Sequence, residues 1–162
     1  MNQTTIDDVH EAGRRIAVTS FPWEHEDIGE LMAASFGTVA RYLAQVGVPI
    51  TGPAIGYYTK QTNGHFRVSA GFVVDDAFES DGNVELMRLP AGRVISTVHI
   101  GPYERLNETY DGLQDYAARH HLVLDQETMW EEYLSAPDVD PSQVHTRVTW
   151  PVTHANVPVP AH

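Results

Sequence analysis

The segment that organises the chain reads Trp130-Glu131-Glu132-Tyr133-Leu134, and Ala136-Pro137 follows it. Successive side chains of a β-strand point to opposite faces, so this segment, as a strand, places Glu131 and Tyr133 on one face. Trp130, Glu132 and Leu134 then share the other face. A carboxylate beside a phenol can pair with a cationic or electron-poor organic ligand, or act as a general base once desolvation raises its pKa. The alternative is an edge strand with a solvated glutamate, the usual state of a strand carboxylate.

The length and composition describe an ordinary globular protein. A chain of 162 residues, 42% of them hydrophobic, can form one domain or two small halves that share a core. Ten Lys and Arg residues against 22 Asp and Glu residues give a formal net charge of −12. A surface that neutralises nucleic-acid phosphates needs a basic patch, and the sequence contains no basic run. We therefore expect no direct nucleic-acid binding.

Several sequence features that would place a protein in or across a membrane are missing. The chain has no apolar run of about 18 residues and no start that resembles a signal peptide. It also has no cysteine, which excludes disulfides and thiol chemistry. We expect no membrane association and a cytoplasmic location.

Hydrophobic periodicity divides the chain into alternating strands and helices. Predicted strands lie at 12–19, 52–59, 65–72, 84–89, 91–98, 130–134 and 144–150. Predicted helices lie at 27–46 and 102–121. The polar residues 1–11 are predicted to form a flexible N-terminus, and residues 153–162 a loose tail.

Both predicted helices combine end signals with an apolar stripe. In the first, Asp27 can cap the N-terminus with Glu30 in a capping-box position, and Gly47 and Pro49 follow the end. In the second, Pro102 stands in the first turn, where proline is tolerated. The stripes are Ile28, Leu31, Met32, Phe36, Val39, Leu43 and Val46, and Tyr103, Leu106, Tyr110, Leu113 and Ala117.

The two halves of the chain repeat one order of elements: strand, helix, strand, strand. Ala12-Gly13-Arg14 before the first unit is echoed by Ala91-Gly92-Arg93 before the second. This order predicts an internal duplication. We predict an α+β fold of duplicated strand-helix-strand-strand units with pseudo-twofold symmetry, its halves at about 12–83 and 84–152 of a domain at 12–152. Two units joined edge to edge would leave a central ligand cleft, with Tyr58 roughly opposite Tyr133.

Several motifs together resemble the GyrI-like small-molecule-binding family, whose domain is also the effector-binding part of multidrug-responsive regulators. They are His99-Ile100-Gly101-Pro102-Tyr103-Glu104, Trp130-Glu131-Glu132-Tyr133-Leu134 with Pro137, Pro141, and Thr146-Arg147-Val148-Thr149-Trp150-Pro151-Val152. The resemblance runs from about Arg14 to Val152. It implies a duplicated fold with a central cleft for aromatic or cationic organic molecules.

The resemblance assigns roles to particular residues of this chain. The family's strand glutamate falls on Glu131, its neighbouring tryptophan on Trp130 and its tyrosine on Tyr133. The family often has an acidic residue where this chain has Arg147, which changes the polarity expected at one rim. Gly56 or Tyr57 occupies the matching register in the first half, so we expect one carboxylate to face the ligand.

These considerations give a candidate site with two kinds of residue. Glu131 and Tyr133 are the candidate catalytic residues, as base and hydrogen-bond donor. The candidate ligand-binding residues are Trp130, Tyr58, Tyr103, Tyr110 and Phe66. Tyr58, Tyr110 and Phe66 each have the alternative of being ordinary core residues.

The nine histidines raise the question of a metal site. His120 and His121 are adjacent at a predicted helix end, where they would point in different directions and cap carbonyl groups. His65, His99 and His145 lie on three predicted strands, without the short spacing of metal ligands. We predict no metal site and no cofactor.

Three classes of function remain. The first is a stand-alone protein that binds aromatic or cationic drug-like compounds for sequestration or detoxification. The second, which the resemblance implies, is a hydrolase that opens cyclopropane rings of DNA-alkylating natural products with Glu131 as the base. The third, which the resemblance also implies, is an inhibitor protein that modulates DNA gyrase, and an acidic surface would suit that role. Whether a protein partner exists stays open. A transcription factor is not expected, because only about a dozen residues precede the first strand.

Overall fold

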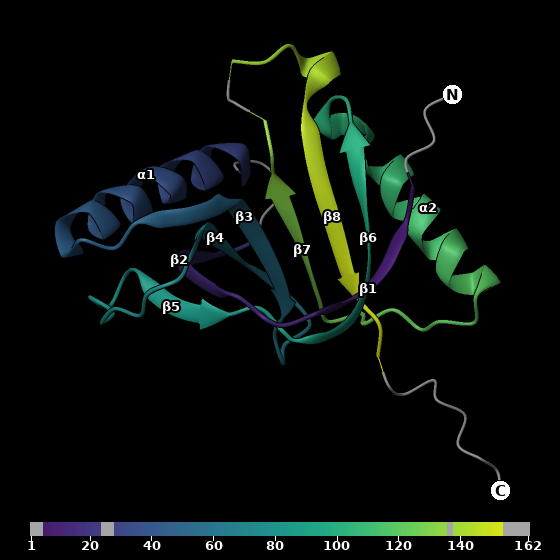
Figure 1. The fold of residues 1–162 in the computed structure, drawn as a ribbon, viewed down its shortest axis with the longest axis horizontal. Coiled ribbons are helices and arrows are strands. Elements are labelled where there is room, and N and C mark those ends of the chain that lie inside the picture. Colours follow the sequence, from purple (N-terminus) through teal and green to yellow (C-terminus); the bar gives the residue numbers. More distant parts are fainter. Residues whose placement is uncertain (1–4, 24–27, 136–137, 154–162) are drawn as a thin grey trace, which may run out of the picture.

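The computed structural model describes residues 5–23, 28–135 and 138–153, and within these the chain forms one eight-stranded antiparallel sheet and two α-helices (Figure 1). The strand order is β1-β6-β8-β7-β3-β4-β2-β5. The strands are β1 Asp7–Glu11, β2 Arg15–Pro22, β3 Ile50–Lys60, β4 Phe66–Val74, β5 Glu85–Arg88, β6 Gly92–Ile100, β7 Thr128–Tyr133 and β8 His145–Pro151. Short 3₁₀ turns lie at Tyr103–Arg105 and Pro141–Gln143. The predicted α+β class is confirmed.

The helices lie close to their predicted limits. Helix α1 spans Ile28–Val46, and its predicted capping residue Asp27 lies outside the described residues. Helix α2 spans Leu106–Arg119 and follows the turn that starts after Pro102. The apolar stripe of α1 buries Met32, Val39 and Leu43 against the sheet, as expected from helical spacing. Leu31 and Val46 at the edges of the stripe are instead exposed.

The element order is the same in both halves: β2-α1-β3-β4, and then β6-α2-β7-β8. Strands β3 and β7 pair with each other and join the two halves into one sheet. Figure 1 shows α1 and α2 at opposite ends of the molecule, with β3, β7, β8 and β6 between them. The additional strands β1 and β5 lie at the two edges of the sheet.

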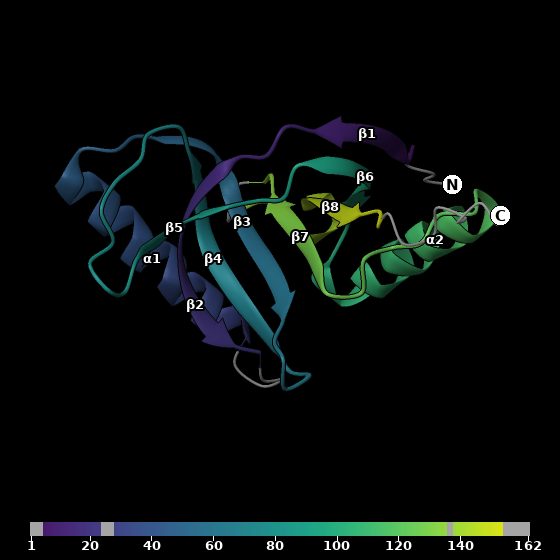
Figure 2. The same ribbon diagram turned by 90° about the horizontal axis from the view of Figure 1, so that it is seen from below.

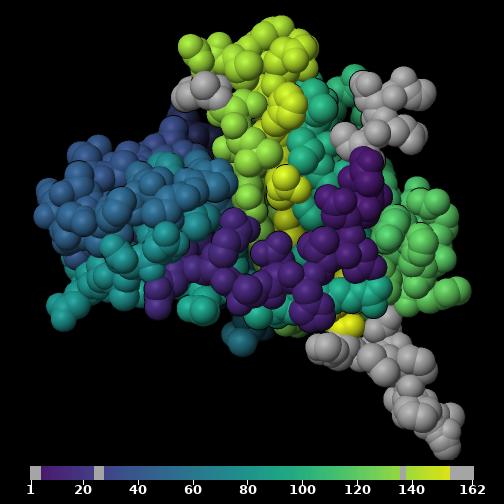
Figure 3. Space-filling view, viewed as in Figure 1, coloured from purple at the N-terminus to yellow at the C-terminus, as the bar shows by residue number. Residues whose placement is uncertain are grey.

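The N-terminal segment differs from its prediction. Residues 1–11 were expected to be flexible, but Asp7–Glu11 forms β1 and pairs with β6 along its whole length (Figure 2). An ion pair between Arg93 Nη2 and Asp8 Oδ2, 2.6 Å apart, supports the pairing. Hydrophobic periodicity could not reveal this strand, because its first four residues are exposed and main-chain hydrogen bonds hold it. Figure 3 shows the N-terminal part of the described chain, in purple, lying across this face between the parts of the chain that contain α1 and α2.

The sheet has two differently packed faces. On one face, residues from β2, β3, β4, β6 and β7 pack on each other, with Trp130 and Tyr57 in edge-to-face contact at 6.2 Å. The sheet is twisted, so residues of strands that are not neighbours, such as β2 and β6, meet on this face and form a core without a helix. Glu132 lies on this face, buried, and its Oε2 lies 2.5 Å from Nη2 of Arg14. The helices pack on the opposite face, α1 on β2, β3 and β4 and α2 on β6.

Candidate functional site

Glu131 lies in β7 at the middle of the sheet and faces the helices. It is only 6% exposed. Its Oε1 accepts hydrogen bonds from the hydroxyls of Tyr133, at 2.8 Å, and Tyr58, at 3.3 Å. Its Oε2 accepts one from Tyr110 on α2. Side chains from β3, β7 and α2 thus converge on one buried carboxylate.

The pairing of β3 with β7 explains this convergence. Gly56 stands directly opposite Glu131, and residues paired across an antiparallel ladder share a face. Because Gly56 has no side chain, the ring of Tyr133 can lie over it; a Cβ there would fall 2.7 Å from the Tyr133 hydroxyl oxygen. Tyr58 stands opposite Met129, two residues from Glu131, and its hydroxyl lies 3.4 Å from that of Tyr133.

The buried environment changes the acid–base properties of the cluster. Burial raises the pKa of Glu131, and the hydrogen bonds from Tyr110, Tyr133 and Tyr58 offset only part of this effect. Burial, and next the nearby Glu131 charge, raise the pKa values of the same three tyrosines well above their usual range. The tyrosines therefore keep their protons and act as donors to the carboxylate.

A cavity of about 1060 Å³ opens in front of Glu131, between the two helices. Its walls are largely apolar and aromatic, with Trp23, Ile28, Met32, Phe36, Tyr58, Phe66, Phe72, Tyr103, Leu106, Tyr110, Met129, Tyr133 and Trp150 among the lining residues. Glu131 and Asp125 are its acidic residues. Among the residues that the structure describes, no Lys, Arg or His lines it. The cavity is large enough for a drug-sized organic molecule.

The structure brings most of the predicted site residues together. Glu131, Tyr133, Tyr58 and Tyr110 form the hydrogen-bonded cluster. Tyr103 and Phe66 line the cavity. The ring of Tyr103 is in edge-to-face contact with that of Tyr133, and the two ring centroids are 6.2 Å apart. Partial burial, and then the charge of Glu131, raise the pKa of Tyr103 as well.

Two residues that the family resemblance singled out lie away from the cavity. Trp130, predicted as a ligand-binding residue, is 1% exposed and packs in the core on the opposite face of β7. Its assignment to the site does not hold, because neighbouring residues of a strand point to opposite faces. Arg147 pairs across strands with Glu132, so it lies on the same far face and does not set the polarity of the cavity.

The aromatic walls also contain residues that were not predicted. The ring of Phe36 on α1 is in edge-to-face contact with that of Tyr133, with ring centroids 6.0 Å apart. The ring of Trp23 makes the same kind of contact with Tyr58, at a centroid distance of 6.3 Å, and with Phe66, at 6.0 Å. Phe36 was assigned to the apolar stripe of the first helix. An apolar stripe does not distinguish residues that line a cavity from residues in the core, because both positions favour apolar side chains.

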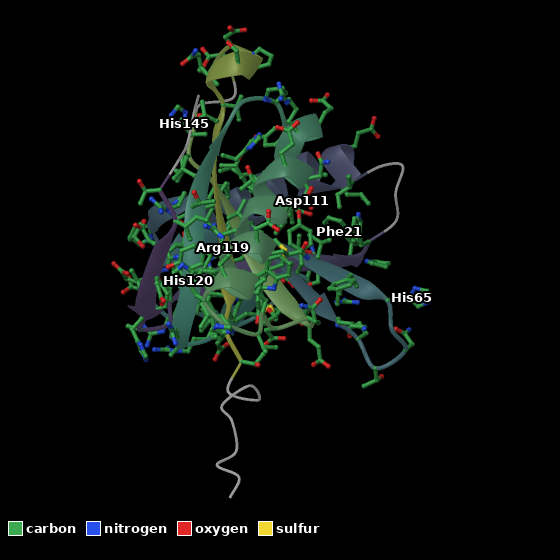
Figure 4. The ribbon with its side chains drawn as sticks, turned by 90° about the vertical axis from the view of Figure 1, so that its right-hand side faces the viewer. Phe21, His65, Asp111, Arg119, His120 and His145 are labelled. Carbon is green, nitrogen blue, oxygen red and sulfur yellow. The ribbon has the colours of Figure 1, made fainter. Side chains whose placement is uncertain are left out.

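The described ranges contain no group of three or more His, Asp or Glu side chains that could hold a metal ion. Figure 4 shows His65, His120 and His145 on separate parts of the molecule. His99 is buried, and its ring nitrogens lie 2.7 Å from Thr109 Oγ1 and 3.0 Å from the Pro102 carbonyl. This histidine holds the turn that carries Tyr103. No helix in these ranges is long and apolar enough to cross a bilayer.

The raised pKa of Glu131 predicts how stability depends on pH. A carboxyl group whose pKa is higher in the folded state binds more protons when folded, so stability falls as pH rises between the two pKa values. The window begins near the usual glutamate value of about 4.3 and ends at the raised value. Chemical denaturation should show Glu131→Gln gaining stability relative to the wild type across this window, by at most about 1.4 kcal/mol per pH unit. A constant difference across the window would contradict the buried-charge account.

Gly56→Ala should disturb the cluster directly. The added Cβ would lie 2.7 Å from the Tyr133 hydroxyl oxygen and 2.9 Å from Met32 Cε, so Tyr133 must move off Glu131. We expect a loss of about 1–3 kcal/mol in the free energy of unfolding, as for other overpacked sites. Gly112→Ala in α2 is the matched control, since its Cβ would meet no atom within 4 Å. It should be neutral or stabilising, and an equal loss in both variants would refute the proposed steric role of Gly56.

Sites that hold small organic molecules commonly enclose them in an apolar cavity with a few placed polar groups, and the cavity around Glu131 has this form. The fold and site thus define a small-molecule-binding domain. The chain belongs to the GyrI-like small molecule binding domain family, whose model matches residues 6–153. This confirms the resemblance found in the sequence.

Several solved structures share the fold. The C-terminal domain of EcmrR has a TM-score of 0.71 at 17% identity, over 93% of this chain and 97% of that one. A hydrolase from Listeria innocua has a TM-score of 0.65 at 14% identity, over 91% of each chain. SAV2435 bound to tetraphenylphosphonium has a TM-score of 0.63 at 12% identity, over 99% of this chain and all 100% of that one. No curated protein matches the chain significantly.

Proposed function

We propose that the protein binds aromatic organic cations in the cavity around Glu131. The observation that supports this most directly is a buried carboxylate without a cationic partner among the described residues of the cavity wall. Its hydrogen bonds come from neutral tyrosine hydroxyls, which stabilise the charge without neutralising it. A bound cation would supply the missing opposite charge.

The walls of the cavity suit the rest of such a ligand. Aromatic side chains attract cations over their ring faces and offer large apolar areas to organic substituents. Tyr58, Tyr103, Trp23 and Phe66 supply such rings to the walls of the cavity. Tetraphenylphosphonium, the molecule bound in the SAV2435 structure, combines a positive charge with four aromatic rings. It is the natural first probe.

In this proposal the protein acts in the cytoplasm and holds toxic or drug-like cations away from their targets. The net charge of −12 favours the approach of cations from solution. The same charge opposes binding to nucleic acid, so we expect no association with duplex DNA at physiological salt. An inhibitor role at gyrase would need a protein-binding surface, and we have no observation that favours one.

We further propose that the two halves arose by duplication and that the cavity lies on their pseudo-twofold axis. The shared element order of the halves and the central β3–β7 pair support this. In this view Gly56 and Glu131, which face each other across that pair, occupy equivalent places in the two halves.

Isothermal titration calorimetry with two matched compounds tests the proposed function. Tetraphenylphosphonium carries the charge, and triphenylphosphine oxide offers similar rings without it. We expect the cation to bind at least tenfold more tightly, because only the cation gains from the buried carboxylate. Equal affinities, or binding of neither compound, would contradict the proposal.

A second candidate function is hydrolysis of a strained electrophile, and the raised pKa of Glu131 favours it. Burial brings a carboxylate closer to the pKa that suits a general base at neutral pH. Glu131 would take a proton from water as the water oxygen attacks a cyclopropane carbon. The ring C–C bond would break, and its electrons would pass to a conjugated carbonyl oxygen that a tyrosine hydroxyl stabilises. The proton held by Glu131 would then pass to that oxygen and restore the carboxylate. Mass spectrometry of a cyclopropane-bearing alkylator incubated with the protein would detect the product, which has gained one water.

A further inference from the structure

A second cavity, of about 420 Å³, lies where β2 begins and has the opposite charge character. Arg14, Arg15 and Arg88 line it, three of the ten Lys and Arg residues in a chain with 22 acidic residues. We propose that this cavity binds the phosphate group of a small phosphorylated molecule. It lies apart from the residues around Glu131, so this proposal stands independently of the function proposed above.

Two of the arginines form a like-charge pair. Arg15 in β2 and Arg88 in β5 stand directly opposite each other in the sheet, an arrangement that is unfavourable for equal charges. Arg15 donates one hydrogen bond to the main-chain carbonyl of Asp75. Both side chains are exposed to solvent, and the guanidinium of Arg88 makes no hydrogen bond or ion pair with any residue that the structure describes. An anion between the two side chains would turn their repulsion into a shared attraction.

Arg14 lines the cavity but is already paired with acidic side chains. Its Nη2 lies 2.5 Å from Glu132 Oε2 and its Nε lies 4.0 Å from Glu11 Oε1, which fixes the guanidinium in place. The contacts to the anion therefore come from the guanidinium groups of Arg15 and Arg88.

The remaining wall contributes one hydroxyl group and one carboxylate, those of Thr51 and Asp75. Thr51 Oγ1 lies 3.4 Å from the Val73 carbonyl, which is long for a hydroxyl hydrogen bond, so its proton can turn to an anion. Asp75 also lines the cavity, and its carboxylate opposes anion binding.

The chemistry of the arginines selects phosphate. A guanidinium presents planar, paired N–H donors that match phosphate oxygens, and it stays charged at all relevant pH values. A cavity of 420 Å³ falls within the range of small-molecule sites and exceeds what a free phosphate ion would fill. The fitting ligand is therefore a compact phosphate monoester, for which ribose 5-phosphate is a suitable probe.

Calorimetry with the 162-residue chain tests this site with ribose 5-phosphate, and with ribose as the uncharged control at equal ionic strength. We expect the phosphate ester to bind and ribose not to bind. Arg88→Gln should weaken binding about 10-fold to 100-fold, the ratio that corresponds to hydrogen bonds with a charged group. Asp75→Asn should strengthen binding, because it removes the carboxylate from the wall. Inorganic phosphate in the same assay shows whether the ester contributes beyond the ion.

Two variants complete the design. Arg41→Gln removes the same charge from the exposed surface of α1 and should leave binding unchanged. Glu131→Gln should also leave it unchanged, which separates this site from the cavity between the helices. The proposal is overturned if ribose 5-phosphate does not bind at millimolar concentration. It is equally overturned if Arg88→Gln binds like the wild type, or if Arg41→Gln loses as much as Arg88→Gln.

Discussion

Glu131→Gln should weaken the binding of tetraphenylphosphonium about 100-fold and leave triphenylphosphine oxide nearly unaffected. Two opposite charges about 5 Å apart attract each other by about 3 kcal/mol at the effective dielectric constant of a partly buried site. That energy corresponds to a factor of about 100 in the dissociation constant. Glutamine keeps the shape of the side chain and can still accept hydrogen bonds from the tyrosines. The aromatic contacts, which serve both compounds, remain in place.

The charge-matched control is Glu85→Gln. Glu85 is exposed in the edge strand β5, so this variant changes the net charge equally without touching the cavity. Its affinity for the cation should stay within about twofold of the wild type. A 100-fold loss in both variants would show that long-range attraction to the acidic surface, and not the buried carboxylate, drives binding. Equal loss of both compounds in Glu131→Gln would show that the charge has no specific role.

If the protein hydrolyses a strained electrophile, Glu131→Gln should lower the turnover rate by about 10²–10⁴, the usual contribution of a general base. The amide cannot take the proton from water, although it still fills the space of the carboxylate. Tyr133→Phe should lower the turnover rate less than Glu131→Gln does, because Tyr58 and Tyr110 remain within the cluster as donors. Single-turnover rates measured by mass spectrometry, with neutral-ligand affinity as the folding control, distinguish these outcomes. Hydrolysis by Glu131→Gln at the wild-type rate would remove Glu131 as the base.

Much of the fold could be predicted because periodicity reports which face of an element is buried. The apolar stripes predicted the two helices, and the strand predicted at 65–72 lies nearly where β4 occurs. Strand β1 could not be predicted in this way, since its pairing depends on main-chain bonds and on Asp8 meeting Arg93. The strand order depends on pairings between residues far apart in the chain, such as Gly56 with Glu131, which local pattern does not encode.

The part of the site that lies on strand β7 could be predicted from the sequence. The parts that come from several elements could be predicted less well. Alternation along β7 alone placed Glu131 and Tyr133 together and Trp130 on the other face, and the structure agrees. Including Trp130 in the site followed the family resemblance against this alternation. The walls supplied by Trp23 and Phe36 depend on how α1 and the end of β2 pack, which the sequence does not show. The basic cavity depends on residues of β2, β3, β4 and β5 that meet only in the folded sheet.

The most direct test of the central claim is a crystal structure of the protein with tetraphenylarsonium, whose arsenic atom can be located by its anomalous scattering. This cation has the same shape and charge as tetraphenylphosphonium. The account predicts a single strong arsenic peak in the cavity between α1 and α2, beside Glu131 and among Tyr58, Tyr110 and Tyr133. An arsenic peak elsewhere on the protein, with this cavity left empty, would contradict it.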